Sequence, residues 1–207
     1  MAKLKSYGIA KSRAFRTLWI AGETGVQYEQ VQTFWGDDTI KAPDFLKANP
    51  MAQVPAIDDE GFGLSESMAI NLYLAKKYGK GLYPSDVQGE AKCWQWSFFA
   101  ATSLERSMGM MVANRYTLPK EKRNEAVAKE NLEAVKRPLS ALEAALGKTP
   151  YLLGQNFTIA DLNVAAVLYG AWFNKHDFSA MPKVAAWLER CLTRPGAQGA
   201  RKLREAA

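Results

Sequence analysis

Ser12 stands directly before a helical pattern and among basic residues, a setting that suits the binding of an anion. The apolar periodicity of 14–23 predicts a helix, so the Ser12 hydroxyl would lie at a helix N-terminus, where unpaired amides and the dipole favour negative charge. Nearby basic side chains add positive charge: Lys11, Arg13 and Arg16. One such anion is the thiolate of a bound ligand. Lowering the pKa of that thiol from about 8.5 to about 6.5 would take roughly 2.7 kcal/mol of preference for the thiolate. From the residues alone, an ordinary N-cap serine is the simpler interpretation.

A second candidate region surrounds Pro55. Val54-Pro55 begins a predicted strand, where proline has no hydrogen-bond donor, and this leaves backbone groups of Val54 available. Glu66 and Ser67 open an apolar-periodic segment, so they should lie at another helix N-terminus. An exposed peptide edge beside a carboxylate-binding helix end would suit a peptide ligand. A turn proline followed by a serine N-cap is the ordinary alternative.

The composition is that of an ordinary globular protein. The chain has 207 residues, of which 48% are hydrophobic, enough to bury a core in one large or two small domains. No apolar run approaches the roughly 20 residues of a membrane span, and no secretory signal opens the sequence, which predicts a cytoplasmic location. Cys93 and Cys191 lack metal-binding spacing and His176 is the only histidine, so we expect no metal.

The charges indicate no charged macromolecular partner. The net charge of +6 comes from interleaved rather than blocked charges, so we expect neither a nucleic acid nor a membrane to bind. A mild basic cluster near the end is interpreted as a solvated helix face: Arg194, Arg201, Lys202 and Arg204.

The elements that must position these residues fall into two groups. Up to residue 79 the pattern predicts the order strand, helix, strand, helix, strand, strand, helix, at 3–8, 14–23, 26–33, 43–49, 54–57, 62–64 and 66–78. The first strand, helix and strand imply a parallel pair, and the last two strands a hairpin. The glycine- and proline-rich segment 79–86 is interpreted as a linker.

The residues from 88 onward predict helices only. Apolar residues that recur every three or four positions are expected to share one face of a long helix, as core or interface: Ala91, Trp94, Phe98, Ala101, Leu104, Met108 and Met111. Thr158 and Asp161 have the spacing of a capping box. The helices expected after the first one lie at 121–146, 158–173, 183–194 and 195–205.

Two segments, Gln-Val-Pro-Ala-Ile at 53–57 and Leu-x-Glu-Ser-x-Ala-Ile at 64–70, resemble the glutathione-binding half of cytosolic glutathione S-transferases. The Thr-Ile-Ala-Asp block that starts at Thr158 is similar to the second-domain signature of that family. The resemblance extends over nearly the whole chain and implies the glutathione S-transferase fold, with an α/β thioredoxin-like domain at 1–79 and an all-α helical domain at 88–207 that forms much of the acceptor site. It also implies a cis Val54–Pro55 bond, a homodimer, and glutathione as co-substrate without a metal.

The stretch Tyr-Gly-x-Ala-x-Ser at 7–12 is similar to serine-type transferases, in which this serine activates the glutathione thiol, and we assign the chain to their bacterial branch. Other branches use a tyrosine at the end of the first strand, so Tyr7 remains an alternative. We prefer Ser12 because its loop reaches the helix end directly. The resemblance implies further glutathione contacts, with the glycyl carboxylate, the cysteinyl part and the γ-glutamyl end in turn: Lys41; Gln53, Val54 and Pro55; Glu66 and Ser67.

The implied reaction is conjugation of glutathione to small apolar electrophiles, a detoxification chemistry. In the family the acceptor site lies between the first-turn loop and the long helix, and the candidates here are Trp35, Met108, Met111, Tyr116 and Trp172. Two alternatives stay open: a non-catalytic ligand-binding or regulatory protein on the same fold, and a glutathione-dependent isomerase, peroxidase or dehalogenase. Retention of Ser12, Glu66 and Ser67 together favours a transferase.

Overall fold

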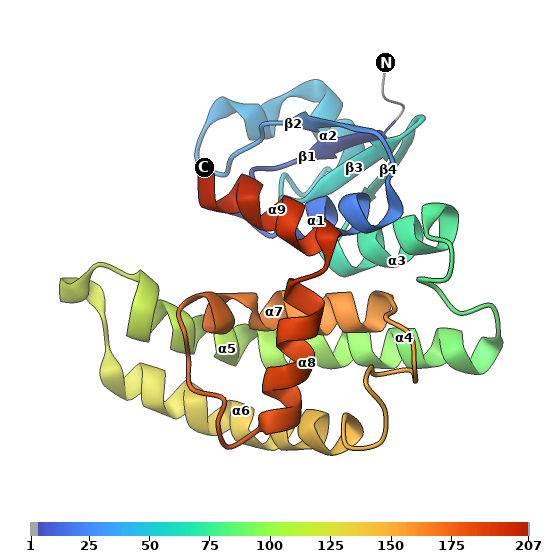
Figure 1. The fold of residues 1–207 in the computed structure, drawn as a ribbon. Coiled ribbons are helices and arrows are strands. Elements are labelled where there is room, and N and C mark those ends of the chain that lie inside the picture. The colour runs from blue at the N-terminus through green and yellow to red at the C-terminus, as the bar shows by residue number, and fades with distance from the viewer. Residues whose placement is uncertain (1–3, 207) are drawn as a thin grey trace. The chain divides into compact units, whose positions relative to one another are not determined.

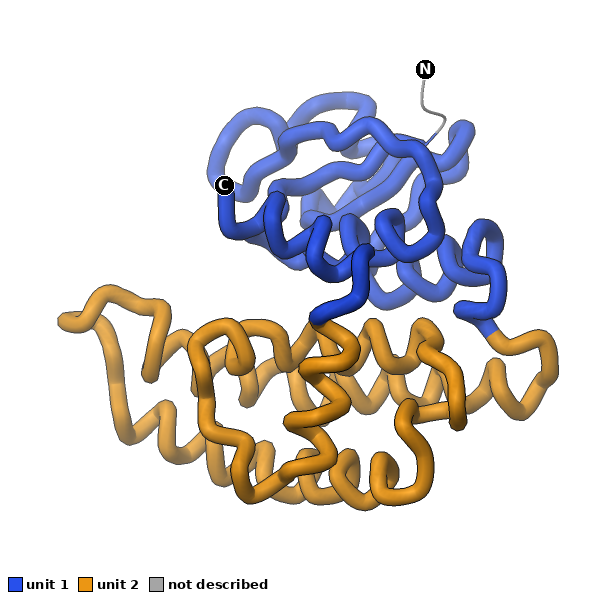
Figure 2. The backbone as a smooth tube through the Cα atoms, in the orientation of Figure 1, with its two compact units in different colours: residues 1–83, 193–207 blue, residues 84–192 orange. Residues whose placement is uncertain are grey.

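A computed structural model gives the structure of residues 4–206. The chain divides into two compact units (Figure 2). Unit 1 holds the residues up to 83 together with those from 193 onward, and unit 2 holds residues 84–192. The expected division at 1–79 and 88–207 placed the last residues with the helical part, whereas these residues pack within unit 1.

Unit 1 contains a four-stranded sheet in the order β2-β1-β3-β4 (Figure 1). Its strands are β1 (Leu4–Tyr7), β2 (Tyr28–Val31), β3 (Ala56–Asp59) and β4 (Phe62–Ser65). β1 pairs in parallel with β2 and antiparallel with β3, which pairs antiparallel with β4. A parallel pair needs a crossover, and the helix α1 (Ala14–Thr24) supplies it. The predicted parallel pair and hairpin are therefore confirmed.

Local signals explain where the elements of unit 1 turn and end. Glu60 and Gly61 join β3 to β4 with φ values of 58° and 93°, which suit a tight two-residue hairpin turn. α1 ends where Gly25 takes the left-handed conformation, with φ of 71°, as predicted for a glycine after the last turn. The other helices of unit 1 are the 3₁₀ turn η1 (Asp38–Lys41), α2 (Pro43–Ala48), α3 (Ser67–Tyr78) and α9 (Pro195–Ala206).

The basic cluster formed by Arg194 and by residues of α9 differs from its prediction as a solvated face. Arg194 donates two hydrogen bonds to Oε2 of Glu23 on α1, at 3.0 and 2.8 Å. Arg204 donates to backbone carbonyls of the segment before α1. The prediction is wrong for these two arginines because their partners lie nearly the whole chain length away in sequence. Lys202 is exposed, as expected.

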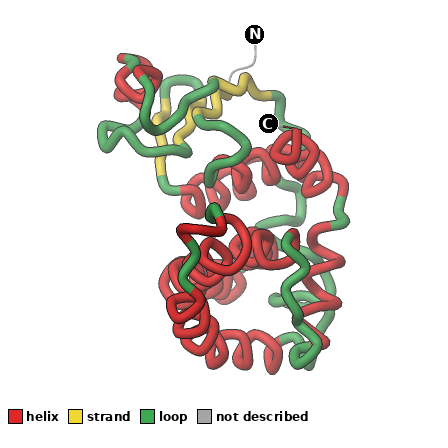
Figure 3. The backbone as a smooth tube through the Cα atoms, turned by 90° about the vertical axis from the view of Figure 1, so that its left-hand side faces the viewer, coloured by secondary structure: helices red, strands yellow, loops and turns green. Residues whose placement is uncertain are grey.

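Unit 2 is built of helices and their connections, and the strands β1 to β4 all lie in unit 1 (Figure 3). Its elements are α4 (Val87–Phe99), the π-helical turn η2 (Ala100–Leu104), α5 (Glu105–Val112), the π-helical turn η3 (Ala113–Thr117), the 3₁₀ turn η4 (Lys120–Lys122), α6 (Glu125–Ala145), α7 (Ile159–Phe173) and α8 (Pro182–Leu192). Helices fill the regions where the sequence predicted them.

The predicted apolar stripe of α4 and α5 is buried only from Leu104 onward. The buried face consists of Cys93, Ser97, Ala100, Leu104, Met108 and Met111, while the first half of the predicted stripe, at Ala91, Trp94, Phe98 and Ala101, is exposed. The predicted stripe advances 13 residues in four turns, about 3.25 per turn, which is tighter than an α-helix with its 3.6. The observed face advances 11 residues in three turns from position 93 to 104. The prediction followed residue type where helix geometry required another register.

The capping box at the start of α7 is confirmed. Thr158 and Asp161 form it reciprocally, and the fully buried Asp161 carboxylate also accepts hydrogen bonds from the Leu152 amide and from Nε1 of Trp187, each at 2.9 Å. One carboxylate thus joins the start of α7 to the preceding turn and to α8. Between residues 4 and 206, no helix is both long and apolar enough to cross a bilayer.

Candidate active site

The register of the sheet brings the candidate segments of unit 1 to one edge. β1 ends at Tyr7, β3 begins at Ala56 and β4 ends at Ser65, and these residues are paired, Tyr7 with Ala56 and Ala56 with Ser65. The loop after β1, the Val54–Pro55 segment before β3, and the start of α3 after β4 therefore leave the sheet at the same end. Segments that are distant in sequence, such as those that carry Ser12 and Ser67, lie at one edge of the sheet for this reason.

Ser12 is half-buried at the start of α1 and makes two hydrogen bonds through its hydroxyl. Oγ donates to the Ile9 carbonyl oxygen at 2.7 Å and accepts from the Ala14 amide at 3.1 Å. The same Ile9 carbonyl also accepts from the Ser12 amide at 3.0 Å. The hydroxyl proton can therefore turn from Ile9 to an incoming sulfur without leaving that carbonyl unpaired. Ser12 can cap α1 and donate to an anion at the same time.

Gly8 lets the loop after β1 approach Val54. A Cβ at Gly8 would lie 3.5 Å from Oγ of Ser12, 3.4 Å from Cβ of Val54 and only 2.7 Å from Cβ of Ala14. Its φ of 132° is also a conformation that other residues rarely adopt. The two predicted site residues thus flank a position that only glycine can occupy. Sequence reasoning missed this role, although glycine after a strand was a usable signal.

Tyr7, the alternative to Ser12, is a core residue. It is 3% exposed and its ring packs on Phe45 with centroids 5.4 Å apart. Burial raises the pKa of the Tyr7 hydroxyl, and the negative charges of Asp58, Asp44 and Glu29 raise it further. A buried, neutral phenol beside acidic residues is poorly placed to favour a thiolate. This environment supports Ser12.

The segment before β3 is held by a residue that the sequence did not single out. The Val54–Pro55 peptide is cis, Pro55 is buried, and the side chain of Gln53 is exposed. Asn49, which is 2% exposed, donates from Nδ2 to the Gln53 carbonyl at 2.7 Å and accepts from the Met51 amide at 3.1 Å. Asn49 thereby fixes the loop that presents Val54.

The start of α3 combines an exposed acid with a buried hydroxyl. Glu66 is the N-cap residue, with φ of 67° and ψ of 109°, values that are costly for a residue with a side chain and often mark a functional site. Ser67 is 5% exposed, and its Oγ accepts a hydrogen bond of 3.1 Å from Nη1 of Arg16, which is itself 7% exposed. Arg16 lies about one turn beyond Ser12 on α1. The sequence suggested Arg16 as a charge near Ser12 but gave no sign of its contact with Ser67.

The structure fixes the backbone at Lys41 but leaves its side chain exposed. Its side chain is 74% exposed, and its amine pairs with the Asp38 carboxylate at 2.8 Å. Its neighbours Ile40 and Ala42 pack, together with Val54, against the buried cluster of Tyr7, Phe45, Ala48 and Ala56. The neighbours of Lys41 therefore pack on the same buried cluster as Val54, while the Lys41 side chain is exposed to solvent.

The acceptor candidates do not form one site within either unit. Trp35 belongs to unit 1 and is 73% exposed. In unit 2, Met108 and Met111 are 1% and 0% exposed, so in this structure they offer no surface to a substrate, and burial speaks against them. Tyr116 is half-buried, and its hydroxyl lies 3.1 Å from Nδ1 of His176.

Two features limit what the remaining candidates can do. Burial, reinforced by the Arg115 charge, lowers the pKa of His176, which favours the neutral imidazole, whose Nδ1 can accept a hydrogen bond from the Tyr116 hydroxyl. Trp172 donates from Nε1 to Oε2 of Glu189 at 2.7 Å. Both aromatic side chains thus already have polar partners within unit 2.

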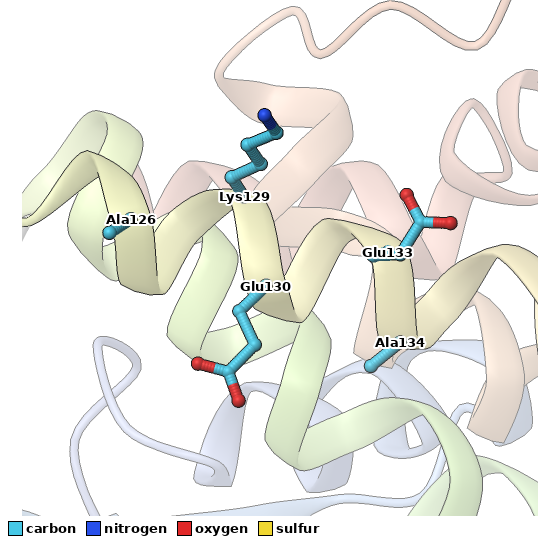
Figure 4. Close-up of a pocket in the computed structure, with 5 residues that line it drawn as sticks. All are labelled: Ala126, Lys129, Glu130, Glu133 and Ala134. Atoms are coloured by element: carbon cyan, nitrogen blue, oxygen red, sulfur yellow. The ribbon is translucent and has the colours of Figure 1, made fainter.

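An open groove of about 550 Å³ lies on α6 (Figure 4) and is lined by Ala126, Lys129, Glu130, Glu133 and Ala134. Lys129 and Glu133 point to one side of the helix, and Glu130 points to the other. Charged groups that diverge in this way cannot act together on one ligand atom. Within residues 4–206, no three His, Cys, Asp or Glu side chains are grouped so as to hold a metal ion.

Comparison with known proteins covers both units. Residues 2–76 match the N-terminal domain of glutathione S-transferases, and residues 106–195 match their C-terminal domain. The chain belongs to the glutathione S-transferase family. A probable glutathione S-transferase of Oryza sativa subsp. japonica, GSTF2, is 32% identical over 205 residues, which cover 96% of this transferase and 95% of the rice protein.

Two further relatives differ in what their names say. The structure of a glutathione S-transferase-I bound with lactoylglutathione has a TM-score of 0.89 and 30% identity, and the match covers 98% of this transferase and all of that chain. Elongation factor 1-gamma 2 of Oryza sativa subsp. japonica is 32% identical over 171 residues, which cover 82% of this transferase but only 40% of that protein. The similar sequences include proteins of rice, Arabidopsis and maize, so the assignment to a bacterial branch is not supported.

Proposed function

We propose that this glutathione S-transferase is of the serine type, and that the Ser12 hydroxyl donates a hydrogen bond to the thiolate of glutathione. The observation that carries the proposal is the double hydrogen bond to the Ile9 carbonyl. This carbonyl still accepts a hydrogen bond from the Ser12 amide when the Ser12 hydroxyl turns away. The N-terminus of α1 adds a favourable field for the negative sulfur. The thiol proton passes to solvent, and the sulfur lone pair then forms a bond to an electrophilic carbon of a small apolar acceptor, from which a leaving group such as halide departs with the electron pair of the bond that breaks.

The rest of glutathione is assigned to the other segments at this sheet edge. Glu66 would pair with the γ-glutamyl ammonium and Ser67 would donate to the γ-glutamyl carboxylate, with the charge of Arg16 nearby. The backbone of Val54, between Gln53 and Pro55, would pair with the cysteinyl part. Lys41 would bind the glycyl carboxylate after leaving Asp38, an exposed pair of about 1 kcal/mol or less.

Calorimetry with glutathione and with S-methylglutathione tests this function. At pH 7 we expect glutathione to release about 0.7 of a proton on binding, because a shift of the thiol pKa from about 8.5 to about 6.5 ionises most of the bound thiol, and to show the ultraviolet absorbance of a thiolate. S-methylglutathione has no ionisable thiol and should bind without that release. The complex should conjugate an activated aryl halide.

A non-catalytic role is the second candidate, and the similarity to an elongation factor subunit is the observation that favours it. In that case both ligands would bind without proton release, or neither would bind. Either result would contradict the proposed chemistry at Ser12.

We also propose a cytoplasmic location, where glutathione is abundant.

We further propose that the protein is a homodimer that buries the exposed apolar side chains of α4. Trp94 is 47% exposed and Phe98 is 67% exposed, and large exposed apolar side chains on one helix are typical of an interface. In Phe98→Asp we expect the dimer dissociation constant to rise by about 10- to 100-fold. Light scattering across a concentration series measures this constant. Phe173→Asp, at a 51% exposed phenylalanine on α7, should leave it unchanged, and a monomeric native protein would contradict the proposal.

A further inference from the structure

The helix α9 packs antiparallel to α1 within unit 1. Near the start of α9, Arg194 pairs with Glu23 at the end of α1. A Cβ on Gly196 would lie 2.7 Å from the Glu23 amide, and a Cβ on Gly22 would lie 2.9 Å from the Gly196 Cα. The two glycines therefore allow the helix backbones to touch. Figure 1 shows the two helices side by side.

This contact sets where the far end of α9 lies. Eight residues separate Gly196 from Arg204, and eight separate Gly22 from Ala14, so each helix advances about 12 Å from the crossing. Arg204 is thereby brought beside the segment that precedes α1. The antiparallel packing accounts for a contact between residues that are 192 positions apart.

The guanidinium of Arg204 binds the loop of Ser12 directly. Nη1 donates to the Ala10 carbonyl at 2.7 Å and to the Ser12 carbonyl at 3.1 Å. The guanidinium carbon lies 5.6 Å from the centroid of the Phe15 ring, within the range of a cation–π contact. Two carbonyls and one aromatic ring thus hold a permanent positive charge against the turn whose side chain is Ser12.

The bonds of Arg204 leave the Ser12 hydroxyl available. Its bonds to Ala10 and Ser12 go to carbonyl oxygens, whereas the Ser12 hydroxyl bonds to the Ile9 carbonyl and the Ala14 amide. The Nη1 group of Arg204 fixes the carbonyls on both sides of Lys11 and so limits rotation of the Ser12 backbone, on which the direction of the side chain depends. A nearby cation also favours the thiolate over the thiol.

We propose that Arg204 is a positioning residue for glutathione activation, which holds the Ala10 and Ser12 carbonyls so that the Ser12 hydroxyl is directed at the sulfur. The proposal rests on the function proposed above for Ser12. It assigns to the last helix a role in the chemistry of the first loop, beyond its packing on α1.

The test follows the thiolate absorbance of bound glutathione against pH in the wild-type protein, in Arg204→Gln and in Arg204→Lys. In Arg204→Gln we expect the apparent pKa of the bound thiol to rise by about half to one unit. We also expect kcat to fall by about 1.5- to 3-fold at pH 7 and by about 3- to 10-fold below about pH 6, with less than a twofold change in KM for glutathione. Arg204→Lys keeps the charge but not the planar guanidinium that lies over the Phe15 ring, so it should show a smaller rise.

Lys202→Gln is the matched control, since it removes the same charge from an exposed site on the same helix, and it should titrate like the wild-type protein. An unshifted titration in Arg204→Gln would overturn the positioning role even if the melting temperature falls. If Arg204→Gln does not fold, an unshifted titration in Arg204→Lys would overturn it. A wild-type complex without any thiolate absorbance would refute the function of Ser12, and the role of Arg204 with it. A normal wild-type titration with unshifted variants would refute only the latter.

Discussion

Replacing Ser12 by alanine is expected to remove most of the thiolate from bound glutathione while the ligand still binds. If the native site lowers the thiol pKa from about 8.5 to about 6.5, the thiolate fraction at pH 7 falls about 25-fold in the variant. The conjugation rate should fall less, about 3- to 25-fold, because a thiolate of higher pKa is the better nucleophile. The loss of thiolate should grow toward 100-fold below about pH 6 and vanish above about pH 9.

The measurement is the ultraviolet thiolate absorbance together with kcat/KM from about pH 5.5 to 9.5. Loss of the cap on the Ala14 amide should also lower stability by about 1 kcal/mol, a separate effect that thermal unfolding records. Tyr7→Phe is the control, because Tyr7 is buried and has a raised pKa. If Tyr7→Phe removed the thiolate and Ser12→Ala retained it, the roles assigned to these two residues would have to be exchanged.

The largest effect on stability is expected at Asp59, at the end of β3. Its carboxylate side chain is 0% exposed and accepts hydrogen bonds from Nζ of Lys77 at 2.7 Å, from the Tyr73 hydroxyl at 2.8 Å and from the Tyr78 hydroxyl at 2.9 Å. These donors all belong to α3, so the network ties the β3–β4 hairpin to the helix. In Asp59→Asn, the carboxamide presents an NH₂ group to donors. We expect the free energy of unfolding to fall by about 2–3 kcal/mol, toward the lower part of the usual range because Lys77 is 36% exposed.

The pH dependence provides a second readout for Asp59. Burial by itself would raise the pKa of Asp59, but the hydrogen bonds from Lys77, Tyr73 and Tyr78 outweigh it and hold this pKa below its ordinary value. The folded pKa is thus lower than the unfolded one, so the stabilisation is present above the unfolded pKa of about 3.9 and is lost as pH falls through the folded value. The difference between the wild-type protein and Asp59→Asn should therefore shrink below about pH 4.

Urea unfolding from about pH 3 to 7 measures both effects. The control is Glu60→Gln, which changes an exposed carboxylate 4.0 Å from the same lysine and should cost less than about 0.5 kcal/mol. An equal loss in both variants would mean that the buried network contributes no more than a surface pair.

Much of the fold could be predicted because its signals are local. Gly25 ends α1 through its own backbone freedom, Thr158 and Asp161 cap α7 across three residues, and the turn at Glu60 and Gly61 joins two short strands. The order of strands and helices followed from such signals. Resemblance in the Val54–Pro55 and Glu66–Ser67 segments supplied the family, which residue chemistry alone had left open.

The prediction failed where side-chain partners depend on which elements meet. Arginine is typical of a solvated surface, and the antiparallel packing of α9 on α1 decides the contacts of the two arginines. Arg194 bonds to Glu23, and Arg204 bonds to the loop of Ser12. Arg16 likewise donates a hydrogen bond to Ser67, which is 51 positions away in sequence. Trp94 and Phe98 have the types of core residues, yet the register of α4 leaves them exposed.

By itself the sequence determined the elements, their order, the family and the types of the candidate site residues, because turns, caps and periodic patterns depend on residues close together in the chain. Only the tertiary structure decided that Gly8 separates Ser12 from Val54, that Tyr7 is buried, and which arginines face the site. These outcomes depend on strand register and helix packing, which join atoms that are distant in sequence and carry no local signal.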